Sequence, residues 1–261
     1  MHLGPGTRAL VTGTSRGIGR ALAERLAARG VSVGLVARSE REVEALADAL
    51  PGSHVVLGGV DVADRAAIAD AVERFGRADV VVANAGVAHY EPFAEQAVEH
   101  FEEMTRVNWL GTLYTVHAAL PRLLRQGSGH LVVVSSGVAH RAFPSAAVYG
   151  ATKAAQHVFA EALRHELSGT GVSLTTVYPG EIATSLHDRY RGRMPPWANM
   201  ANRVPAHRMA DRIIRGIERD ERQVFFPPVV RLLSAVNGVS PTLADALLRR
   251  ARGPAAAPRR S

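Results

Sequence analysis

The chain has 261 residues, of which 47% are hydrophobic and none is cysteine, and its formal net charge at pH 7 is +7. This length and apolar content predict a single α/β domain with a large buried core, while the lack of cysteine excludes disulfides, thiolate nucleophiles and cysteine metal sites. Because the sequence shows neither an N-terminal secretory signal nor a run of about 18 apolar residues, it predicts a soluble, cytoplasmic protein.

Short apolar, β-branched runs alternate with helical patterns from one end of the chain to the other. The predicted strands are 9–12, 31–37, 55–60, 80–83, 131–135, 174–178 and 224–226, and the predicted helices are 18–29, 40–50, 65–75, 94–125, 147–168 and 206–219. This alternation is typical of βαβ units, and the nearly continuous apolar strands are typical of a sheet covered on both faces. The sequence therefore predicts an α/β fold, a doubly wound parallel sheet of about seven strands with helices on both faces.

Two segments interrupt this alternation. Residues 185–205, which include Trp197, are too long for a simple connection and are predicted to form a substrate loop. After a catalytic domain at 1–228, an apolar segment and a helix that starts behind Ser240-Pro241 predict an amphipathic helical extension at 229–252, followed by a disordered tail at 253–261. Six arginines and one acid lie beyond residue 228, so most of the excess positive charge belongs to this C-terminal region.

A glycine-rich turn follows the first predicted strand and opens the first predicted helix. Its glycines are spaced Gly-x3-Gly-x-Gly, which allows a tight turn and a close approach of the backbone to a pyrophosphate. Backbone N–H groups at the N-terminus of the helix would meet the phosphate charge. An ordinary glycine-rich turn is the alternative. The predicted phosphate-binding residues are Gly13, Ser15, Arg16, Gly17, Ile18 and Gly19.

Arg38 stands at the end of the second predicted strand, where an NAD enzyme normally carries an acid that binds the ribose 2′-hydroxyl. Together with Arg16 it can hold a 2′-phosphate through charge-assisted hydrogen bonds, which favours NADP(H). Glu40 lies close by in sequence and keeps NAD(H) open as the cofactor. A plain surface charge is the other interpretation of Arg38.

Polar residues and glycine also follow the third and fourth predicted strands, as Asp61-Val62 and as Asn84 with Gly86. The carboxyl ends of parallel strands are where open α/β sheets bind ligands. Asp61 is therefore predicted to reach the adenine, and Gly86 to let the cofactor approach the backbone. Each of these residue types is also common in ordinary turns.

Tyr149 and Lys153 open the long helix after the fifth predicted strand and lie one turn apart on the same face. Lys153 is the single lysine among 31 basic side chains. An ammonium beside a phenol favours the phenolate, so we expect Lys153 to lower the pKa of Tyr149 toward the range in which it exchanges protons with a substrate. Ser136, at the end of the fifth strand, can hydrogen-bond the substrate oxygen. Each residue alone is unremarkable, but the three together indicate a reaction centre.

In these motifs the chain resembles the short-chain dehydrogenase/reductase family, although Ala83 stands where many members have an asparagine. The matching motifs, in the family's order, are Thr12-Gly-x3-Gly-Ile-Gly19, Asn84-Ala-Gly86, Val107-Asn108, Ser135-Ser136, Tyr149-x3-Lys153 and Pro179-Gly180. The resemblance implies a Rossmann-like sheet in a homodimer or homotetramer, and hydride transfer without a metal. It implies that Tyr149 is the acid/base, that Ser136 anchors the substrate oxygen and that Lys153 binds the nicotinamide ribose. It further implies cofactor contacts by Tyr149, a water held by Asn108, and residues beside the nicotinamide, namely Pro179, Ile182 and Thr184.

The sequence therefore predicts an NADP(H)-dependent oxidoreductase, a carbonyl reductase or secondary-alcohol dehydrogenase that acts on a lipophilic ketone or alcohol. A dinucleotide-binding regulator that uses the same fold without turnover is the alternative. The arginines of the C-terminal region have no aromatic residues between them, so nucleic acid is not a predicted partner. The apolar residues beside these arginines leave a peripheral membrane contact open.

Overall fold

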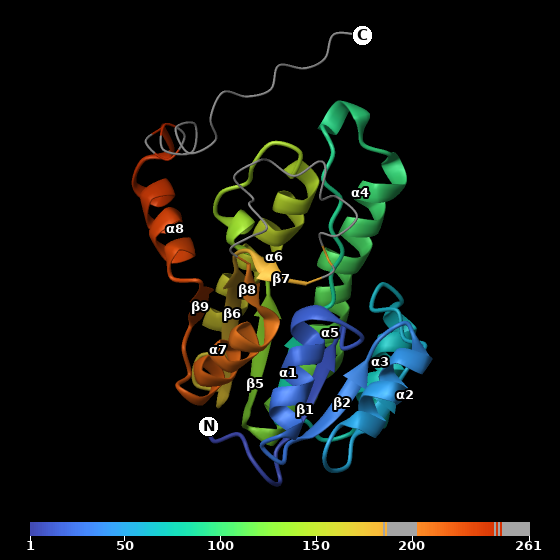
Figure 1. The fold of residues 1–261 in the computed structure, drawn as a ribbon. Coiled ribbons are helices and arrows are strands. Elements are labelled where there is room, and N and C mark those ends of the chain that lie inside the picture. Colours follow the sequence, from blue (N-terminus) through green and yellow to red (C-terminus); the bar gives the residue numbers. More distant parts are fainter. Residues whose placement is uncertain (185, 187–202, 243, 245, 247–261) are drawn as a thin grey trace.

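Seven strands form one parallel sheet in the computed structural model (Figure 1). The structure describes residues 1–184, 186, 203–242, 244 and 246. The strands of this sheet are β1 (Arg8–Thr12), β2 (Ser32–Val36), β3 (Val55–Leu57), β4 (Val80–Ala83), β5 (Gly129–Val134), β6 (Val172–Pro179) and β9 (Gln223–Phe226). Their order across the sheet is β3-β2-β1-β4-β5-β6-β9, and every neighbouring pair is parallel. The predicted doubly wound α/β fold is confirmed.

The central strands are buried on both faces, which explains their continuous apolar sequences. All four residues of β4 are buried, and Leu10 of β1 pairs in register with Val81 of β4. At the edge, β3 ends at Leu57, earlier than predicted, because Gly58 and Gly59 follow it and Gly59 has a φ of +70°. That conformation belongs to turns rather than strands.

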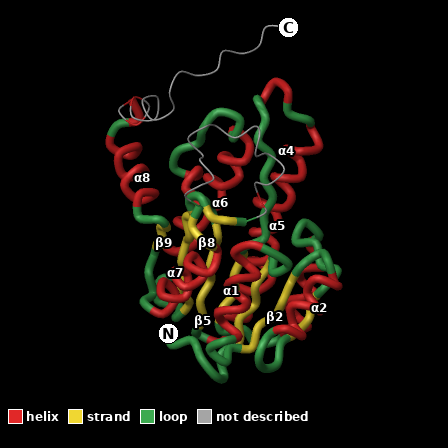
Figure 2. Tube along the Cα trace, viewed as in Figure 1, coloured by secondary structure: helices red, strands yellow, loops and turns green. Residues whose placement is uncertain are grey.

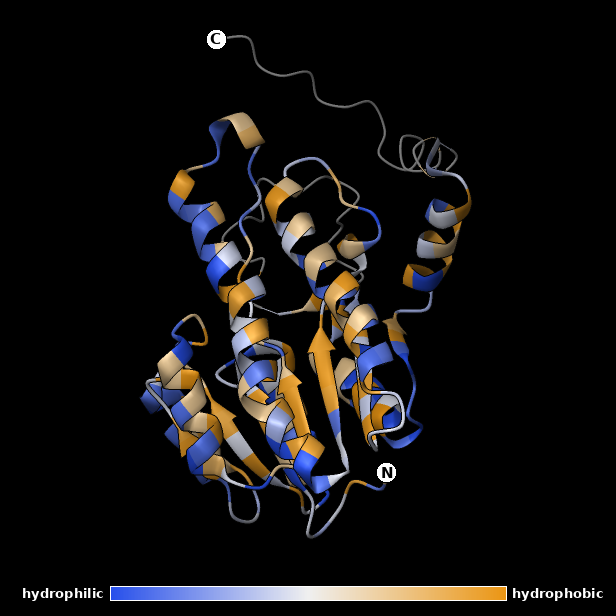
Figure 3. Ribbon diagram, turned by 180° about the vertical axis from the view of Figure 1, so that it is seen from behind, coloured by the Kyte–Doolittle hydropathy of each residue, from blue (hydrophilic) through white to orange (hydrophobic). Residues whose placement is uncertain are grey.

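Helices cover the two faces of the sheet in two layers (Figure 2). On one face pack α1 (Gly17–Ala27), α2 (Glu40–Ala49) and α7 (Ala206–Glu218), and on the other α3 (Arg65–Phe75), α5 (Gly111–Gln126) and α6 (Ala147–Glu166). Seen from behind, the strands are mostly hydrophobic, and the helices around them mix hydrophobic and hydrophilic residues (Figure 3). Each layer buries an apolar stripe, as Leu22 and Leu26 do on α1 and Val72 and Phe75 on α3.

The prediction of one helix over 94–125 is wrong in its first part. The observed order is a short 3₁₀ turn (Phe93–Glu95), α4 (Val98–Met104), a π-helical segment (Thr105–Leu110) and then α5. Asn108 explains the widened turn, because its backbone carbonyl accepts hydrogen bonds from the side chains of Thr112 and Gln156, both at 2.8 Å. Such π-helical turns are frequent at functional sites.

Beyond the main sheet, β7 (Ile182–Ala183) pairs with β8 (Val204–Pro205), and α8 (Val229–Val239) follows β9. In Figure 1, α4 and α8 rise on opposite sides of the same end of the molecule. The N–H of Ala244 donates to the carbonyl of Ser240 at 3.0 Å, as expected for a helix that starts there. Most of the predicted loop 185–205, and all of the predicted tail 253–261, lie outside the described residues. No helix in the described part of the chain is both long and apolar enough to cross a membrane.

Candidate active site

A cavity of about 770 Å³ lies at the carboxyl ends of the strands, within the size range of small-molecule sites. The predicted site residues in its wall are Gly13, Ser15, Arg16, Gly17, Ile18, Arg38, Asp61, Val62, Asn84, Gly86, Ser136, Tyr149, Lys153, Pro179, Ile182 and Thr184. Gly19 and Asn108 do not contribute to this wall. The structure thus brings residues from separate motifs into one space, while the role of each in binding or chemistry stays a prediction.

The glycine-rich turn needs each of its three glycines. Gly13 and Gly17 have φ angles of +74° and +62°, in the left-handed region that favours glycine. A Cβ on Gly19 would lie 2.2 Å from the carbonyl oxygen of Gly13, so only glycine lets α1 pack this close to the turn. Arg16, the residue before α1, makes no side-chain cap, and the first turn of α1 carries no acid. The first N–H groups of α1 therefore remain suited to an anion from the cavity.

Asn84 and Thr12 hold this turn against the end of β4. The Nδ2 of Asn84 donates to the carbonyl of Thr12 at 2.8 Å, and the Oγ1 of Thr12 accepts from the N–H groups of Asn84 and Ala85 at 3.0 and 3.1 Å. Asn84 is therefore a structural support of the turn as well as a residue of the cavity wall.

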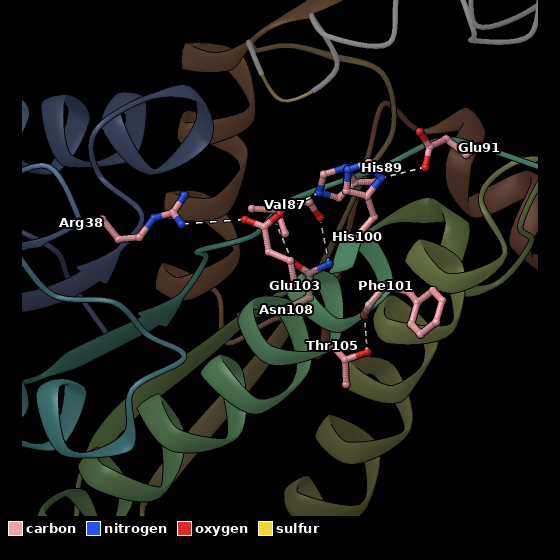
Figure 4. Close-up of polar contacts among 9 residues, drawn as sticks. All are labelled: Arg38, Val87, His89, Glu91, His100, Phe101, Glu103, Thr105 and Asn108. Atoms are coloured by element: carbon pink, nitrogen blue, oxygen red, sulfur yellow. Dashed lines mark hydrogen bonds and ion pairs between the residues drawn. The ribbon is translucent and has the colours of Figure 1, made fainter. Parts of the chain in front are cut away.

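At the end of β2, the wall of the cavity carries charges of both signs. The Arg38 side chain is 58% exposed, and its guanidinium lies 3.9 Å from a carboxylate oxygen of Glu103 on α4 (Figure 4). Glu42, rather than Glu40, lines the cavity. Asp61 accepts a hydrogen bond from the N–H of Ala63 at 2.9 Å, as expected of a turn residue. It also lines the cavity.

Asn108 joins the loop after β4 to α6. It is fully buried, its Oδ1 accepts from the N–H of Val87 at 2.8 Å, and its Nδ2 donates to the carbonyl of Val87 at 2.9 Å and to the hydroxyl of Thr152 at 3.1 Å (Figure 4). The side chain thus fixes the backbone that follows Gly86. The predicted role of Asn108 in holding a water stays a prediction.

Tyr149 is almost fully buried at the first turn of α6. Burial raises the pKa of Tyr149 to about 12, hydrogen bonding with Ser136 and with Tyr90 lowers it, and the nearby charge of Glu181 raises it further. Burial has the largest effect, so the expectation that the pKa of Tyr149 is lowered is wrong for the protein alone. Tyr149 holds its proton at neutral pH.

Lys153 is not among the groups that shift the pKa of Tyr149. Its Nζ donates to the carbonyl of Val134 at 3.0 Å and lies 5.9 Å from the centre of the Tyr149 ring. Burial lowers the pKa of Lys153 to about 7, so near neutral pH only part of the population carries the ammonium. The hydroxyl of Ser135 donates to the backbone carbonyl of Lys153 at 2.8 Å and fixes this turn of α6 against β5.

The cavity wall also contains residues that the sequence did not indicate. Tyr90 and Glu181 approach Tyr149, and Val138, Phe143 and Leu233 form apolar parts of the wall. One carboxylate oxygen of Glu181 is buried without a hydrogen-bond partner among the described residues, and burial raises its pKa. Glu181 could have been found from its position directly after Pro179-Gly180, whereas no local signal marks Tyr90.

Over most of its length the chain is similar to known oxidoreductases. The family model of short chain dehydrogenases matches residues 7–194. An uncharacterized oxidoreductase of Staphylococcus epidermidis is 38% identical over 182 residues, which are 68% of this chain and 79% of the relative. Two solved structures are similar at 28% identity. A short-chain dehydrogenase from Sphingobium yanoikuyae in complex with NADPH has a TM-score of 0.79 and covers 98% of this chain and 99% of its own. An alcohol dehydrogenase from the archaeon Thermococcus sibiricus, complexed with 5-hydroxy-NADP, has a TM-score of 0.73 and covers 84% and 95%.

Proposed function

This chain belongs to the short-chain dehydrogenase/reductase family, and on that premise we propose that it transfers a hydride between NADP(H) and a carbonyl compound or secondary alcohol. One observation carries the proposal. Ser136, Tyr149 and Lys153 line the same cavity as the glycine-rich turn and the N-terminus of α1. A proton-transfer group and an anion site in one cavity are what hydride transfer from a dinucleotide requires.

The residues of the cavity fit a dinucleotide cofactor. The N-terminus of α1, with Gly13 and Gly17, would hold the pyrophosphate, and Arg16 and Arg38 would hold a 2′-phosphate. When bound, the cofactor supplies or accepts the hydride. The two arginines support NADP(H), and the acids Glu42 and Asp61 in the same wall keep NAD(H) as the alternative.

In the proposed reduction, Tyr149 gives its hydroxyl proton to the substrate oxygen, which Ser136 holds through a hydrogen bond. A pKa of about 12 keeps Tyr149 protonated at neutral pH, which supports reduction of a carbonyl over oxidation of an alcohol. Lys153, whose Nζ donates to the carbonyl of Val134, would bind the nicotinamide ribose. Asn108 acts indirectly, because its side chain fixes the backbone of the loop after Gly86.

We propose a lipophilic substrate. The part of the wall around Tyr149 contains Val138, Phe143 and, from α8, Val230 and Leu233. Apolar walls of this kind favour substrates that leave water at little cost.

A substrate screen tests the proposed function. Purified protein is mixed with NADPH and a panel of aliphatic, aromatic and alicyclic ketones, oxidation is followed by absorbance, and NADH is run alongside. We expect turnover with NADPH that Tyr149→Phe removes. Tight binding of NADPH without oxidation across the panel, or turnover that survives in Tyr149→Phe, would instead favour the non-catalytic regulator or a different reaction centre.

For the C-terminal region, we propose a helical extension at 229–252 that covers the substrate end of the catalytic domain and, through its outer face, contacts a membrane surface or another copy of the chain. The exposed Val229, Leu232 and Val239 of α8 support this proposal. Co-sedimentation with anionic liposomes, and light scattering of the protein alone for a homodimer or homotetramer, test both contacts. Leu232→Asp in the full chain should weaken whichever contact exists.

A further inference from the structure

Glu103, on α4, contacts both Arg38 in the cavity wall and the loop that follows β4 (Figure 4). Its Oε1 lies 3.9 Å from the Nη1 of Arg38, and its Oε2 accepts a hydrogen bond from the Nε2 of His89 at 2.8 Å. Arg38 is a residue that the proposed function assigns to the 2′-phosphate. Glu103 itself lies outside the wall of that cavity, and the proposed hydride transfer gives it no task.

The Glu103 carboxylate is held in place by the loop. The His89 side chain is 8% exposed, and its ring stacks on that of His100 with centres 4.0 Å apart and an angle of 12°. The Nδ1 of His100 donates in turn to a carboxylate oxygen of Glu91 at 2.8 Å. His100 and Glu103 both belong to α4, so the helix and the loop bind each other at two points. Turning Glu103 away from Arg38 would take this acceptor from a buried histidine, which is costly.

Arg38 is held less tightly than Glu103. Its side chain is 58% exposed, and Glu103 is the one acid in the described part of the chain with which it forms an ion pair. Exposed ion pairs contribute little to stability. A phosphate group carries more negative charge than a carboxylate and offers three oxygens for charge-assisted hydrogen bonds. Arg38 can therefore leave Glu103 for a phosphate, while Glu103 stays with His89.

Other charged residues lie close to this ion pair but are occupied differently. A hollow beside α4 is lined by Arg38, Asp61, Asp64, Glu99, Glu103 and Arg106, among others. Asp61 and Asp64 accept hydrogen bonds from backbone N–H groups close by in sequence, at 2.9 and 2.8 Å. The surroundings of Arg38 are thus acidic, and Glu103 is the acid that contacts it.

We propose that Glu103 is a specificity-determining residue, whose carboxylate competes with the 2′-phosphate of NADP(H) for Arg38 and so limits the preference for NADP(H) over NAD(H). The inference rests on the proposed function and deepens it. No covalent bond changes, because Arg38 only exchanges a carboxylate for a phosphate. NAD(H) carries a hydroxyl in place of the 2′-phosphate, so its binding leaves the ion pair intact. Glu103 therefore weakens the binding of one cofactor and not of the other.

Glu103→Gln in the full chain tests the inference. Glutamine keeps the length of the side chain, and its amide oxygen can still accept from His89, but it carries no charge. The dissociation constants of NADPH and NADH are measured by calorimetry on the purified protein, so the readout does not depend on turnover. We expect the dissociation constant of NADPH to fall about fivefold and that of NADH to change by less than about twofold. The gain should shrink in about 0.5 M salt, which screens exposed charges.

Glu102→Gln is the matched control. Glu102 is the neighbouring acid on α4 and is exposed, so the variant removes the same charge from the same helix and keeps the contact between Glu103 and Arg38. It should leave both dissociation constants unchanged. Arg38→Ala, alone and combined with Glu103→Gln, shows whether the carboxylate acts through the arginine. Without Arg38, we expect Glu103→Gln to improve NADPH binding by less than about twofold.

The outcomes separate this inference from the proposed function. Wild-type protein that binds a dinucleotide, together with a Glu103→Gln variant that binds NADPH no more tightly than Glu102→Gln does, overturns the role of Glu103 and leaves the proposed function standing. An equal gain with and without Arg38 overturns the competition as well. Wild-type protein that binds neither NADPH nor NADH overturns both proposals. A gain for NADPH that is confined to Glu103→Gln and depends on Arg38 supports the inference.

Discussion

Replacing Lys153 with methionine is expected to stabilise the folded protein while abolishing turnover. Lys153 is 4% exposed, and burial lowers its pKa from 10.5 to about 7. One pKa unit corresponds to about 1.4 kcal/mol, so keeping this lysine in the folded chain at pH 7 costs about 4 kcal/mol relative to a lysine in water. The hydrogen bond from its Nζ to the carbonyl of Val134 recovers about 1 kcal/mol, and losing it leaves that carbonyl without this donor. Since methionine fills similar space without charge, we expect the free energy of unfolding to rise by about 2 kcal/mol.

The pH dependence makes this prediction sharper. Between the folded pKa of about 7 and the unfolded value of 10.5, the unfolded chain binds a proton on Lys153 that the folded chain has released. The wild-type protein therefore gains up to about 1.4 kcal/mol of stability from this group for each unit of rising pH in that window. Below it, both states are protonated and the penalty is constant. The difference in the free energy of unfolding between Lys153→Met and the wild type should thus be largest in mild acid and should decrease as the pH approaches 10.5.

Urea unfolding followed by circular dichroism, at about pH 6, 8 and 9.5 and without cofactor, measures the difference directly. Tyr149→Phe is the control, since it removes a neighbouring hydroxyl but keeps the lysine, and its stability should follow the wild-type pH dependence. The reasoning is refuted if Lys153→Met is less stable than the wild type in mild acid, or if the gap between them does not change with pH.

Three further predictions concern the cofactor and the proton. Because the pKa of Tyr149 is raised to about 12, the rate of ketone reduction should stay constant from about pH 6 to 9, and the rate of alcohol oxidation should rise throughout that range. Initial rates measured in both directions test this. A plateau in the rate of oxidation near neutral pH would contradict it. Arg38→Ala should raise KM for NADPH about 10- to 100-fold and leave KM for NADH nearly unchanged, and equal changes for both would remove Arg38 from the 2′-phosphate site. Gly19→Ala should abolish NADPH binding in calorimetry, because its Cβ would lie 2.2 Å from the carbonyl oxygen of Gly13. Gly238→Ala, where a Cβ meets nothing within 4 Å, is its control and should bind as the wild type does.

The strands and five of the predicted helices could be recognised from sequence because each depends on local patterning, such as the continuous apolar residues of β4 or the apolar stripe of α3. The helix predicted over 94–125 could not be drawn correctly for a tertiary reason. Its widened turn depends on Gln156, whose side chain reaches the carbonyl of Asn108 from 48 residues away. No pattern within the segment records that contact.

For the site, too, features set by local spacing could be predicted from the sequence, and features set by the tertiary fold could not. Spacing within a few residues was enough to predict that Tyr149 and Lys153 share a cavity wall, since one helical turn fixes their relation. Their pKa values were not predictable, because burial by the surrounding fold outweighs the pairwise effect of one side chain on the other. Tyr90 could not be found at all. Its contact with Tyr149 depends on α4 holding the loop around it.

These pKa values give the single lysine a physical explanation. An arginine keeps its charge in almost any surroundings, which suits exposed positions, whereas a lysine can give up its proton when it is buried. Lys153 lies where the fold removes water from the basic group and lowers its pKa to about 7. Arginine there would force a permanent charge into the core with one carbonyl, that of Val134, as its recorded acceptor among the described residues. In a chain that otherwise uses arginine for positive charge, the single lysine stands at a buried position where the fold lowers the pKa of the basic group.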